Sequence, residues 1–374
     1  MKKLLKVKIP AKAISSYPIF IDSGLMKNIR LWLPKHSENM VIITDTQVQK
    51  LFAKKLQETL KKYTKKITLL AFKSGESSKN YKTIQTLTEK ILQRRFGRDT
   101  VLLAVGGGVV GDLAGFIAAT YMRGIPYIQM PTTLLSMVDS SIGGKTGINT
   151  PQGKNLIGAF WQPSVVVTDI DCLKTLPKIH LINGLIEALK MFLTNDKKSF
   201  YYAEKNIDDI LSLQKNILIN TISRALRIKA SIVTLDEKEK NARMILNFGH
   251  TIGHAIENIT QYKMLHGYAV ALGIMVEAKI SEILGILSNE NYEIIYRIFT
   301  KFNISGKKLK TLNIDKLILA TKSDKKNRTG KVRYVLLKNI GDIYKKDKQY
   351  VHSVSDRIVK KAILTVRNSF PTRS

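Results

Sequence analysis

Short apolar runs alternate with longer amphipathic stretches along the first half of the chain. Runs such as Asn39–Asp45, almost wholly apolar and closed by an acid, predict strands that are buried on both faces. Stretches such as Tyr81–Arg95 carry apolar residues at helical spacing. The predicted elements are a pair of strands around Leu5–Ile9 and Tyr17–Ile21, strands at Asn39–Asp45, Lys66–Phe72 and Thr100–Val105, and helices at Gln47–Tyr63 and Tyr81–Arg95.

From Ile179 onward apolar residues recur mainly at helical spacing, and few β-rich runs remain. We expect an α/β domain with a Rossmann-like parallel sheet over residues 1–177 and a mostly α-helical domain over residues 178–374. The boundary is expected at Thr175–Pro177. The helices predicted in the second domain are Gly184–Leu193, Ile207–Ser231, His250–Ile259, Tyr268–Leu287 and Asn291–Phe302.

The longest apolar stretch, Thr100–Met122, has the length of a membrane span. It also contains five glycines, and Asp112 stands at its centre. A charge and this many glycines favour a buried strand, a loop and a helix over a membrane segment. No membrane partner is therefore expected.

Composition narrows the class of protein. A hydrophobic fraction of 44% over 374 residues is typical of packed globular cores. The single cysteine, Cys172, excludes a disulfide framework and a multi-thiolate metal site, so any metal must use histidine and carboxylate ligands. The basic N-terminal segment lacks the apolar core of a signal peptide, and the expected compartment is the cytoplasm.

The formal net charge is +32, from 61 Lys and Arg against 29 Asp and Glu. Such an excess suggests nucleic-acid binding where the cations cluster. Here they form scattered pairs, from Lys54-Lys55 to Lys360-Lys361, without a recognised nucleic-acid motif. We therefore expect a lysine-rich solvated surface and no nucleic-acid partner.

A glycine-rich turn follows the predicted strand Thr100–Val105. Gly106, Gly108 and Gly111 have the G-x-G-x-x-G spacing, which lets a backbone and a helix N-terminus approach a pyrophosphate. The usual ribose-binding acid about 20 residues later is missing, and the acid at a strand end, Asp45, precedes the glycines instead. From this segment alone, a nucleotide site and an ordinary tight turn remain equally open.

Three of the six histidines lie close together in the sequence. His250 and His254 are four residues apart on one predicted helix face, and His266 follows after a short break. This spacing favours a metal site, with the helical pair as the first choice of ligands. Glu187, in an otherwise apolar helix, is a candidate for the carboxylate ligand, and Lys190 lies three residues later on the same face. For Glu187 and Lys190 an ordinary surface ion pair is the alternative.

A third set of polar residues runs from Arg123 through Asp139 and Lys145 to Lys154-Asn155, beside several glycines. Ammonium groups and backbone amides suit phosphate or carboxylate, and polar side chains suit hydroxyls. The set indicates recognition of an anionic, hydroxyl-rich small molecule, with a solvated loop as the alternative.

Six segments, taken together, resemble the 3-dehydroquinate synthase family of sugar-phosphate cyclases. They read GGGVVGDLAGFIAATYMRGIP from residue 106, PTTLLSMVDSSIGGKTGIN from 131, GKNLIGAFWQP from 153, GLIEALK from 184, LNFGHTIGHAIE from 246 and LHGYAVALG from 265. The resemblance extends from Tyr17 to the late Asp324-Lys325-Lys326 and so covers nearly the whole chain.

The resemblance implies an N-terminal domain that binds NAD and a helical domain that binds one divalent metal, Zn²⁺ with Co²⁺ as the alternative. It implies conversion of 3-deoxy-D-arabino-heptulosonate 7-phosphate to 3-dehydroquinate and phosphate, in the shikimate pathway to chorismate and the aromatic amino acids. NAD transiently oxidises a ring hydroxyl, phosphate is eliminated, the hydride returns, the ring opens and an aldol reaction closes the carbocycle. The net reaction is that of a carbon–oxygen lyase. We also expect a homodimer.

The resemblance also assigns residues, and it replaces the helical histidine pair as metal ligands. It implies metal ligation by Glu187, His250 and His266, and catalytic roles for His254, Lys145, Lys190, Arg123 and Asn155. The implied substrate-binding residues are Asp139, Lys154, Lys229, Arg243, Asn247, Lys325 and Lys326. The implied NAD-binding residues are Asp45, Glu76, Lys79, Gly107, Gly108, Asp112, Thr132, Thr133, Lys145, Lys154 and Thr175.

Two positions depart from the family pattern. Tyr268 stands where Glu is common, and Asp22 stands where Gly is common. Tyr268 is two residues from His266, so metal affinity is the property most exposed to this change. Among related enzymes, Lys154-Asn155, Arg243 and Asn247 favour dehydroquinate synthesis over other sugar-phosphate cyclases, and glycerol dehydrogenases would lack so many cations.

Overall fold

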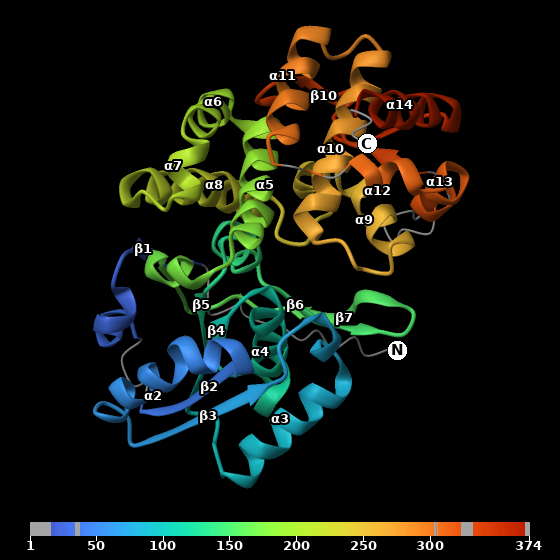
Figure 1. Cartoon of the computed structure of the whole chain (residues 1–374). Helices are drawn as coiled ribbons and strands as arrows, with labels where there is room; N and C mark the ends of the chain where they lie inside the picture. Colours follow the sequence, from blue (N-terminus) through green and yellow to red (C-terminus); the bar gives the residue numbers. More distant parts are fainter. Residues whose placement is uncertain (1–15, 34–37, 303, 305, 323–331, 371–374) are drawn as a thin grey trace, which may run out of the picture.

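The computed structural model of the chain describes residues 16–33, 38–302, 304, 306–322 and 332–370 (Figure 1). Its N-terminal part is built on a six-stranded sheet in which every pairing is parallel. In spatial order the strands are β1 (Ile19–Asp22), β8 (Val165–Asp169), β5 (Tyr127–Pro131), β4 (Thr100–Gly106), β2 (Asn39–Asp45) and β3 (Lys66–Phe72).

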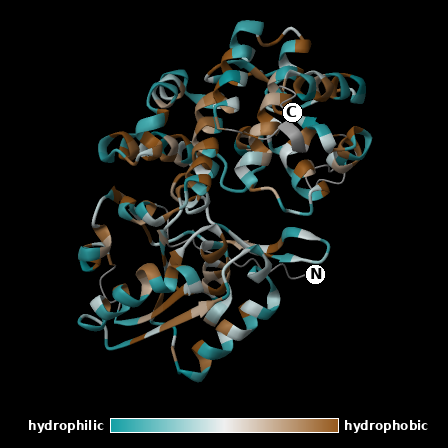
Figure 2. Cartoon of the chain, in the orientation of Figure 1, coloured by the Kyte–Doolittle hydropathy of each residue, from teal (hydrophilic) through white to brown (hydrophobic). Residues whose placement is uncertain are grey.

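Alternate residues of each strand feed two separate cores, as the two-residue period of a strand requires. On one face, Met40 and Ile42 of β2 pack with η1 (Leu25–Trp32) and α2 (Lys54–Lys61). On the other face, Val41 and Ile43 of β2 pack with α3 (Tyr81–Gln93) and α4 (Gly108–Thr120). The strands are therefore mostly hydrophobic along their length, as Figure 2 shows for the sheet.

The structure confirms the predicted Rossmann-like sheet. The three strands predicted from apolar runs are β2, β3 and β4, and the stretch Thr100–Met122 divides into β4 and α4, as expected. The helix predicted at Gln47–Tyr63 is a continuous helical segment, α1 (Thr46–Val48), the π-helical turn η2 (Gln49–Ala53) and α2. None of the described helices combines the length and apolar composition needed to cross a membrane.

Of the two strands expected at the N-terminus, the one predicted at Tyr17–Ile21 is present as β1. β1 pairs in parallel with β8, more than 140 residues later in the chain. The segment around Leu5–Ile9 lies outside the described residues.

The direction in which successive strands are added to the sheet reverses between β2 and β4. From β2 the chain continues to β3 on one side, whereas from β4 it continues to β5 and β8 on the other side. In open parallel sheets such a switch leaves a crevice at the carboxyl ends of the two strands, and ligands bind there. Asp45 ends β2, and Gly107 follows β4, so both candidate nucleotide residues lie at this point.

Residues expected as loops between Val138 and Asn155 partly form a hairpin. Its strands are β6 (Lys145–Thr150) and β7 (Gly153–Phe160), which pair antiparallel and pack against α4. Glycine is needed where the two strands approach most closely, since a Cβ on Gly158 would lie 2.0 Å from the carbonyl oxygen of Thr146. The glycines read as loop signals are therefore partly close-contact positions within a sheet.

The second half is mostly helical, as predicted. Its helices are α5 (Lys178–Asn195), α6 (Lys197–Lys205), α7 (Ile207–Leu211), α8 (Lys215–Leu235), α9 (His250–Ile259), α10 (His266–Ile283), α11 (Asn289–Thr300), α12 (Gly306–Thr311), α13 (Ile314–Lys322) and α14 (Asp356–Ser369). Short strands, not foreseen, follow at β9 (Arg333–Tyr334), β10 (Leu337–Asn339), β11 (Asp342–Ile343) and β12 (His352–Ser353).

One stretch predicted as a single helix is divided into two helices in the structure. The stretch Ile207–Ser231 was expected as a single helix, but α7 and α8 are separate. Leu213 between them has a φ of +63°, a left-handed conformation that ends an α-helix. Apolar spacing alone does not register a break of this kind.

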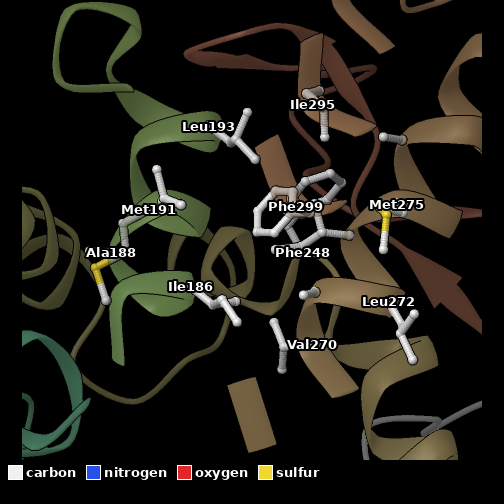
Figure 3. Close-up of a cluster of buried hydrophobic side chains, with 14 of the residues drawn as sticks. Ile186, Ala188, Met191, Leu193, Phe248, Val270, Leu272, Met275, Ile295 and Phe299 are labelled. Atoms are coloured by element: carbon white, nitrogen blue, oxygen red, sulfur yellow. The ribbon is translucent and has the colours of Figure 1, made fainter. Parts of the chain in front are cut away.

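Helices α5 and α10 form the centre of the helical half. Figure 3 shows Ile186 and Leu193 of α5 with Val270 and Met275 of α10 and Phe299 of α11 in one buried cluster. Both central helices are apolar on nearly all sides, which is typical of helices inside a domain.

Glycines bring α9 directly against α10. A Cβ on Gly273 of α10 would lie 1.9 Å from the carbonyl oxygen of Gly249, which precedes α9. A Cβ on Gly253 of α9 would lie 3.1 Å from the Cα of Val270. Glu277 of α10 completes the junction, because its buried carboxylate accepts hydrogen bonds from the amides of Gly249 and Ile252 at 2.8 and 3.4 Å. The first turn of α9 is thus fixed to α10.

We predict that Gly273→Ala destabilises the protein by about 3 kcal/mol or more, because backbone atoms leave no room for the added methyl group. The measurement is urea unfolding of the metal-free protein. Gly97→Ala is the matched control, since its Cβ would meet only the carboxylate of Asp99, and it should cost less than about 1 kcal/mol. Equal stability of the two variants would contradict the proposed helix contact.

Candidate active site

Three helices bring a carboxylate and two histidines together. Glu187 comes from the middle of α5, His250 from the start of α9 and His266 from the start of α10. Glu187 Oε1 lies 3.8 Å from His250 Nε2 and 3.5 Å from His266 Nε2. One ligand atom from each residue lies within 4.8 Å of the others, which is the geometry of a metal-binding group.

The environment of Glu187 fits a metal cation. Its side chain is 0% exposed, and within the described residues its Oε1 atom is buried without a hydrogen bond. A buried carboxylate oxygen without a hydrogen bond is costly, and a cation between it and the two imidazoles would remove that cost. The other oxygen, Oε2, accepts from Lys190 Nζ at 2.5 Å.

The far nitrogens of both rings face acceptors. His250 Nδ1 lies 3.2 Å from the carbonyl oxygen of Phe248, and His266 Nδ1 lies 3.1 Å from Glu257 Oε2. When the rings are neutral, as metal binding requires, donation from Nδ1 leaves the lone pair on each Nε2, the atom on the Glu187 side. This arrangement is typical of histidines that bind metal through Nε2.

The structure places His254 differently from the helical pair first considered. Its ring is 5.2 Å from that of His250 and 6.0 Å from that of His266 between centroids, so it borders the cluster. Its ligand atom groups with those of Glu257 and His266, and not with Glu187. His254 is therefore positioned beside the metal group, open to a different role.

Charges in this cluster shift the ionisation of its members strongly. Burial opposes ionisation of Glu187, but Lys190 and His266 lower its pKa to about 2. Burial also disfavours a charged His266, yet the carboxylates of Glu187 and Glu257 raise its pKa to about 10. In the metal-free protein a proton on His266 thus supplies positive charge between the two carboxylates.

A second buried pair lies next to the first. Lys229 of α8 contacts Asp139, with Nζ 2.7 Å from Oδ1 and a further contact to the Asp139 carbonyl oxygen. Burial would raise the pKa of Asp139, but Lys229 and Lys190 lower it below its usual range. The charges of Glu187, Lys190, Asp139 and Lys229 therefore interact as one group.

Cations from the hairpin and the α8–α9 connection face the same region. Lys145 of β6 pairs with Glu239, and Glu239 Oε1 also accepts from Asn247 Nδ2 at 2.8 Å. Lys154 of β7 lies 3.1 Å from Glu257. Arg243 is 2% exposed and donates to the carbonyl oxygen of Gly143 at 3.1 Å. Residues separated by about 100 positions thus meet between the sheet half and the helical half.

The glycine turn at the sheet edge has the shape of a phosphate cradle. Gly107 precedes α4 without a side-chain cap on the helix. A Cβ on Gly107 would lie 3.2 Å from Thr133 Cγ2, and one on Gly108 would lie 3.1 Å from Ser140 Oγ. A side chain at either position would crowd Thr133 or Ser140. The uncapped amides of a helix N-terminus attract anions. Thr132 donates its amide to Gly106 at 3.0 Å and so places both threonines beside the cradle.

Other predicted nucleotide residues surround this edge. Lys79 contacts Asp112, and its Nζ lies 2.6 Å from Asn155 Oδ1, which joins the α4 turn to the hairpin. Glu76 accepts from Asn149 at 2.8 Å. Asp45 caps α1 by accepting from the amide of Gln47 at 2.8 Å.

Thr175 lies further along, in the helical turn η6 (Ile170–Thr175), and donates to Cys172 at 3.1 Å. It stands just before α5.

Arg123 is not brought to this group within the chain. It is exposed at the end of the turn η4 (Tyr121–Arg123), after α4 has run back along the sheet and before β5 begins. The 13 residues of α4 separate it from the glycine cradle by about 20 Å. Lys325 and Lys326 lie outside the described residues.

Sequence reasoning missed Glu239 and Glu257. Each carboxylate contacts two predicted site residues, Glu239 with Lys145 and Asn247, and Glu257 with Lys154 and His266. The spacing of Glu257, three residues after His254 on one helix face, was an available signal.

Tyr268, which stands where the family commonly has Glu, is a packing residue. Its side chain is partly buried against the helical core.

Two family profiles match the chain, one after the other. Residues 69–183 match "3-dehydroquinate synthase N-terminal", and residues 184–327 match "3-dehydroquinate synthase C-terminal". A 3-dehydroquinate synthase from Thermodesulfovibrio yellowstonii is 43% identical over 329 residues, which cover 87% of this chain and 92% of the relative.

Solved structures agree with the fold. A 2-deoxy-scyllo-inosose synthase complexed with carbaglucose-6-phosphate, NAD⁺ and Co²⁺ has a TM-score of 0.83 and 26% identity, and the alignment covers 92% of this chain and 95% of that one. A 2-epi-5-epi-valiolone synthase from Streptomyces hygroscopicus subsp. jinggangensis 5008, with NAD⁺ and Zn²⁺ bound, has a TM-score of 0.84 and 25% identity, covering 97% and 99%.

We predict that metal uptake releases a proton from His266, because binding through Nε2 requires a neutral ring. Since the pKa of His266 in the metal-free protein is raised to about 10, affinity for Zn²⁺ should increase as the pH rises from 6 to 8. Calorimetry in buffers of different ionisation enthalpy should show about one proton released per metal at pH 7.

His352→Gln is the control for this measurement. His352 contacts the carbonyl oxygen of Tyr344 and belongs to neither group of candidate metal ligands, so proton release should be unchanged. Affinity independent of pH in the wild type would show that His266 is neutral or is not a ligand.

Proposed function

The chain belongs to the 3-dehydroquinate synthase family, and from this premise we propose that it converts 3-deoxy-D-arabino-heptulosonate 7-phosphate to 3-dehydroquinate and phosphate. The observation that carries the proposal is the buried Glu187 carboxylate, with two imidazole Nε2 atoms directed at it and buried cations beside it. The uncapped glycine cradle at the switch point of the sheet supports an NAD site next to it. The protein is an enzyme of this family, and the proposed reaction class is a carbon–oxygen lyase.

NAD bound at the cradle supplies a hydride acceptor, and a divalent metal, Zn²⁺ or Co²⁺ as in the solved relatives, supplies a Lewis acid. Glu187, His250 and His266 would hold the metal. Gly107, Gly108, Thr132 and Thr133 would surround the pyrophosphate, with Asp45 at the adjoining strand end. Glu76, Lys79, Asp112 and Thr175 complete the proposed NAD set, together with Lys145 and Lys154.

The substrate carries a phosphate and a carboxylate, and the site offers cations for both. Lys145, Lys154, Lys229 and Arg243 are held between the two halves of the chain by carboxylates or carbonyl oxygens. An incoming anion would take the place of partners such as Glu239. Charge-assisted hydrogen bonds from these groups would fix the orientation of the substrate. Asn155, Asn247 and Asp139 would bind hydroxyls.

His254 is proposed as the proton-transferring residue. It borders the metal group and lies close to His266 without being aimed at Glu187. Lys190 would stabilise negative charge near the metal ligands, since it contacts Glu187 from within the core. Elimination then breaks the carbon–oxygen bond, and phosphate leaves with the electron pair while a proton is removed from the neighbouring carbon. The ring carbon whose hydroxyl is oxidised before this elimination is reduced again afterwards, so the overall reaction has no net redox change.

Several finer points stay proposals. Division of the chain into residues 1–177 and 178–374 is supported by Pro177, which immediately precedes α5. Arg123, Lys325 and Lys326 are kept as proposed substrate contacts on the family resemblance alone. A homodimer and a cytoplasmic location also remain predictions.

We predict that purified protein with NAD and Zn²⁺ releases phosphate from the heptulosonate phosphate and forms 3-dehydroquinate in equal amounts. The measurement couples a phosphate assay to chromatography of the product. Glucose 6-phosphate is the comparison substrate, since its carba-analogue is bound by the inosose synthase relative. Turnover of glucose 6-phosphate alone would identify a different sugar-phosphate cyclase.

We predict that His250→Ala lowers turnover by more than about 100-fold and releases the metal, because two protein ligands cannot hold it tightly. Metal content after dialysis is measured by elemental analysis. His180→Ala is the matched control, since this half-buried histidine opens α5 outside the site, and it should retain metal and activity. Full metal content in His250→Ala would contradict the assignment of this ligand.

A further inference from the structure

Glu257 joins the metal group to the hairpin. It lies on α9 with a side chain that is 5% exposed, and its two oxygens have different partners. Oε2 accepts from His266 Nδ1 at 3.1 Å, and Oε1 accepts from Lys154 Nζ at 3.1 Å. One buried carboxylate therefore connects a proposed metal ligand of the helical half with a proposed substrate cation of the sheet half.

The side of His266 that Glu257 contacts decides its role. Glu257 faces Nδ1, whereas Nε2 is the atom near Glu187 and thus toward the metal group. A carboxylate on the far nitrogen fixes the ring orientation and increases the basicity of the ligating nitrogen. His254, Glu257 and His266 also lie within metal-binding distance of one another, but a metal there would have to displace the contact between Glu257 and Nδ1.

Lys154 and His266 both contact the carboxylate of Glu257, so the negative charge of Glu257 is divided between these two partners. Its Nζ also lies 4.0 Å from the centroid of the Tyr262 ring, so the cation is held on two sides. A substrate anion that attracts Lys154 would leave more of the carboxylate charge to His266. The imidazole would then bind a metal more tightly, because its Nδ1 proton is more strongly accepted.

We propose that Glu257 is a positioning residue that orients His266 for the metal and, through Lys154, couples metal binding to substrate binding. The coupling rests on the proposed function, since it takes the heptulosonate phosphate as the anion. Linkage requires the effect to be reciprocal: the substrate tightens metal binding by the same factor by which the metal tightens substrate binding.

The first test measures Zn²⁺ affinity without substrate, by competition with a chromogenic chelator. Glu257→Ala should weaken affinity by about 10- to 100-fold, and Glu257→Gln, which keeps an acceptor but loses the charge, by a smaller factor. Glu282→Gln is the control, because it removes a carboxylate paired with Lys279 on α10, and its affinity should stay within twofold. Wild-type affinity in both Glu257 variants would overturn the proposal.

The second test does not depend on the folding of any Glu257 variant. In the wild type without NAD, in which the substrate cannot be oxidised and is not consumed, saturating heptulosonate phosphate should tighten Zn²⁺ binding several-fold. In Lys154→Met that effect should be lost, while Zn²⁺ affinity without substrate is equal to or tighter than in the wild type. Absence of coupling in a wild type that turns over substrate would refute the proposal. A wild type without turnover, but with weakened Zn²⁺ binding in Glu257→Ala, would instead refute the proposed function alone.

Discussion

A carboxylate buried without solvent at the centre of a helical core sets the main constraint on this structure. Glu187 is fully enclosed on α5, and a charge in that position is tolerated only when positive groups surround it. Lys190 supplies one of them through Oε2, and the imidazoles of His250 and His266 stand at Oε1. The glycine contact packs α9 directly against α10, the two helices that begin at His250 and His266. Packing and metal chemistry therefore depend on the same few residues.

The same constraint explains how the two halves are joined. The sheet half ends its strands at an edge suited to a nucleotide, and the helical half presents the metal group. Ion pairs between them use residues proposed for the substrate: Lys145 with Glu239, Lys154 with Glu257, and Lys229 with Asp139. Few of the 61 cationic residues are placed in this way, so the net charge of +32 says little about function.

Much of the fold could be predicted from the sequence, because local spacing carries that information. For the candidate site, spacing alone favoured His250 with His254 as metal ligands, whereas the structure groups His250 with Glu187 and His266, the set that the family resemblance implied. Continuous apolar runs predicted β2, β3 and β4, and the glycine spacing predicted the turn before α4. Contacts between distant elements could not be predicted in this way. Glu257 meets Lys154 about 100 residues away, and one sequence gives no signal for that pairing. The left-handed Leu213, which divides a predicted helix, and the position of Arg123 on the opposite edge of the sheet depend on the folded chain.

The most direct test of the account is the position of the metal, measured by anomalous X-ray diffraction at the zinc edge from crystals grown with Zn²⁺ and NAD. The account predicts one strong peak about 2.0–2.1 Å from the Nε2 atoms of His250 and His266, with a carboxylate oxygen of Glu187 as the third protein ligand. A peak coordinated by His254 and Glu257, with Glu187 unligated, would contradict it.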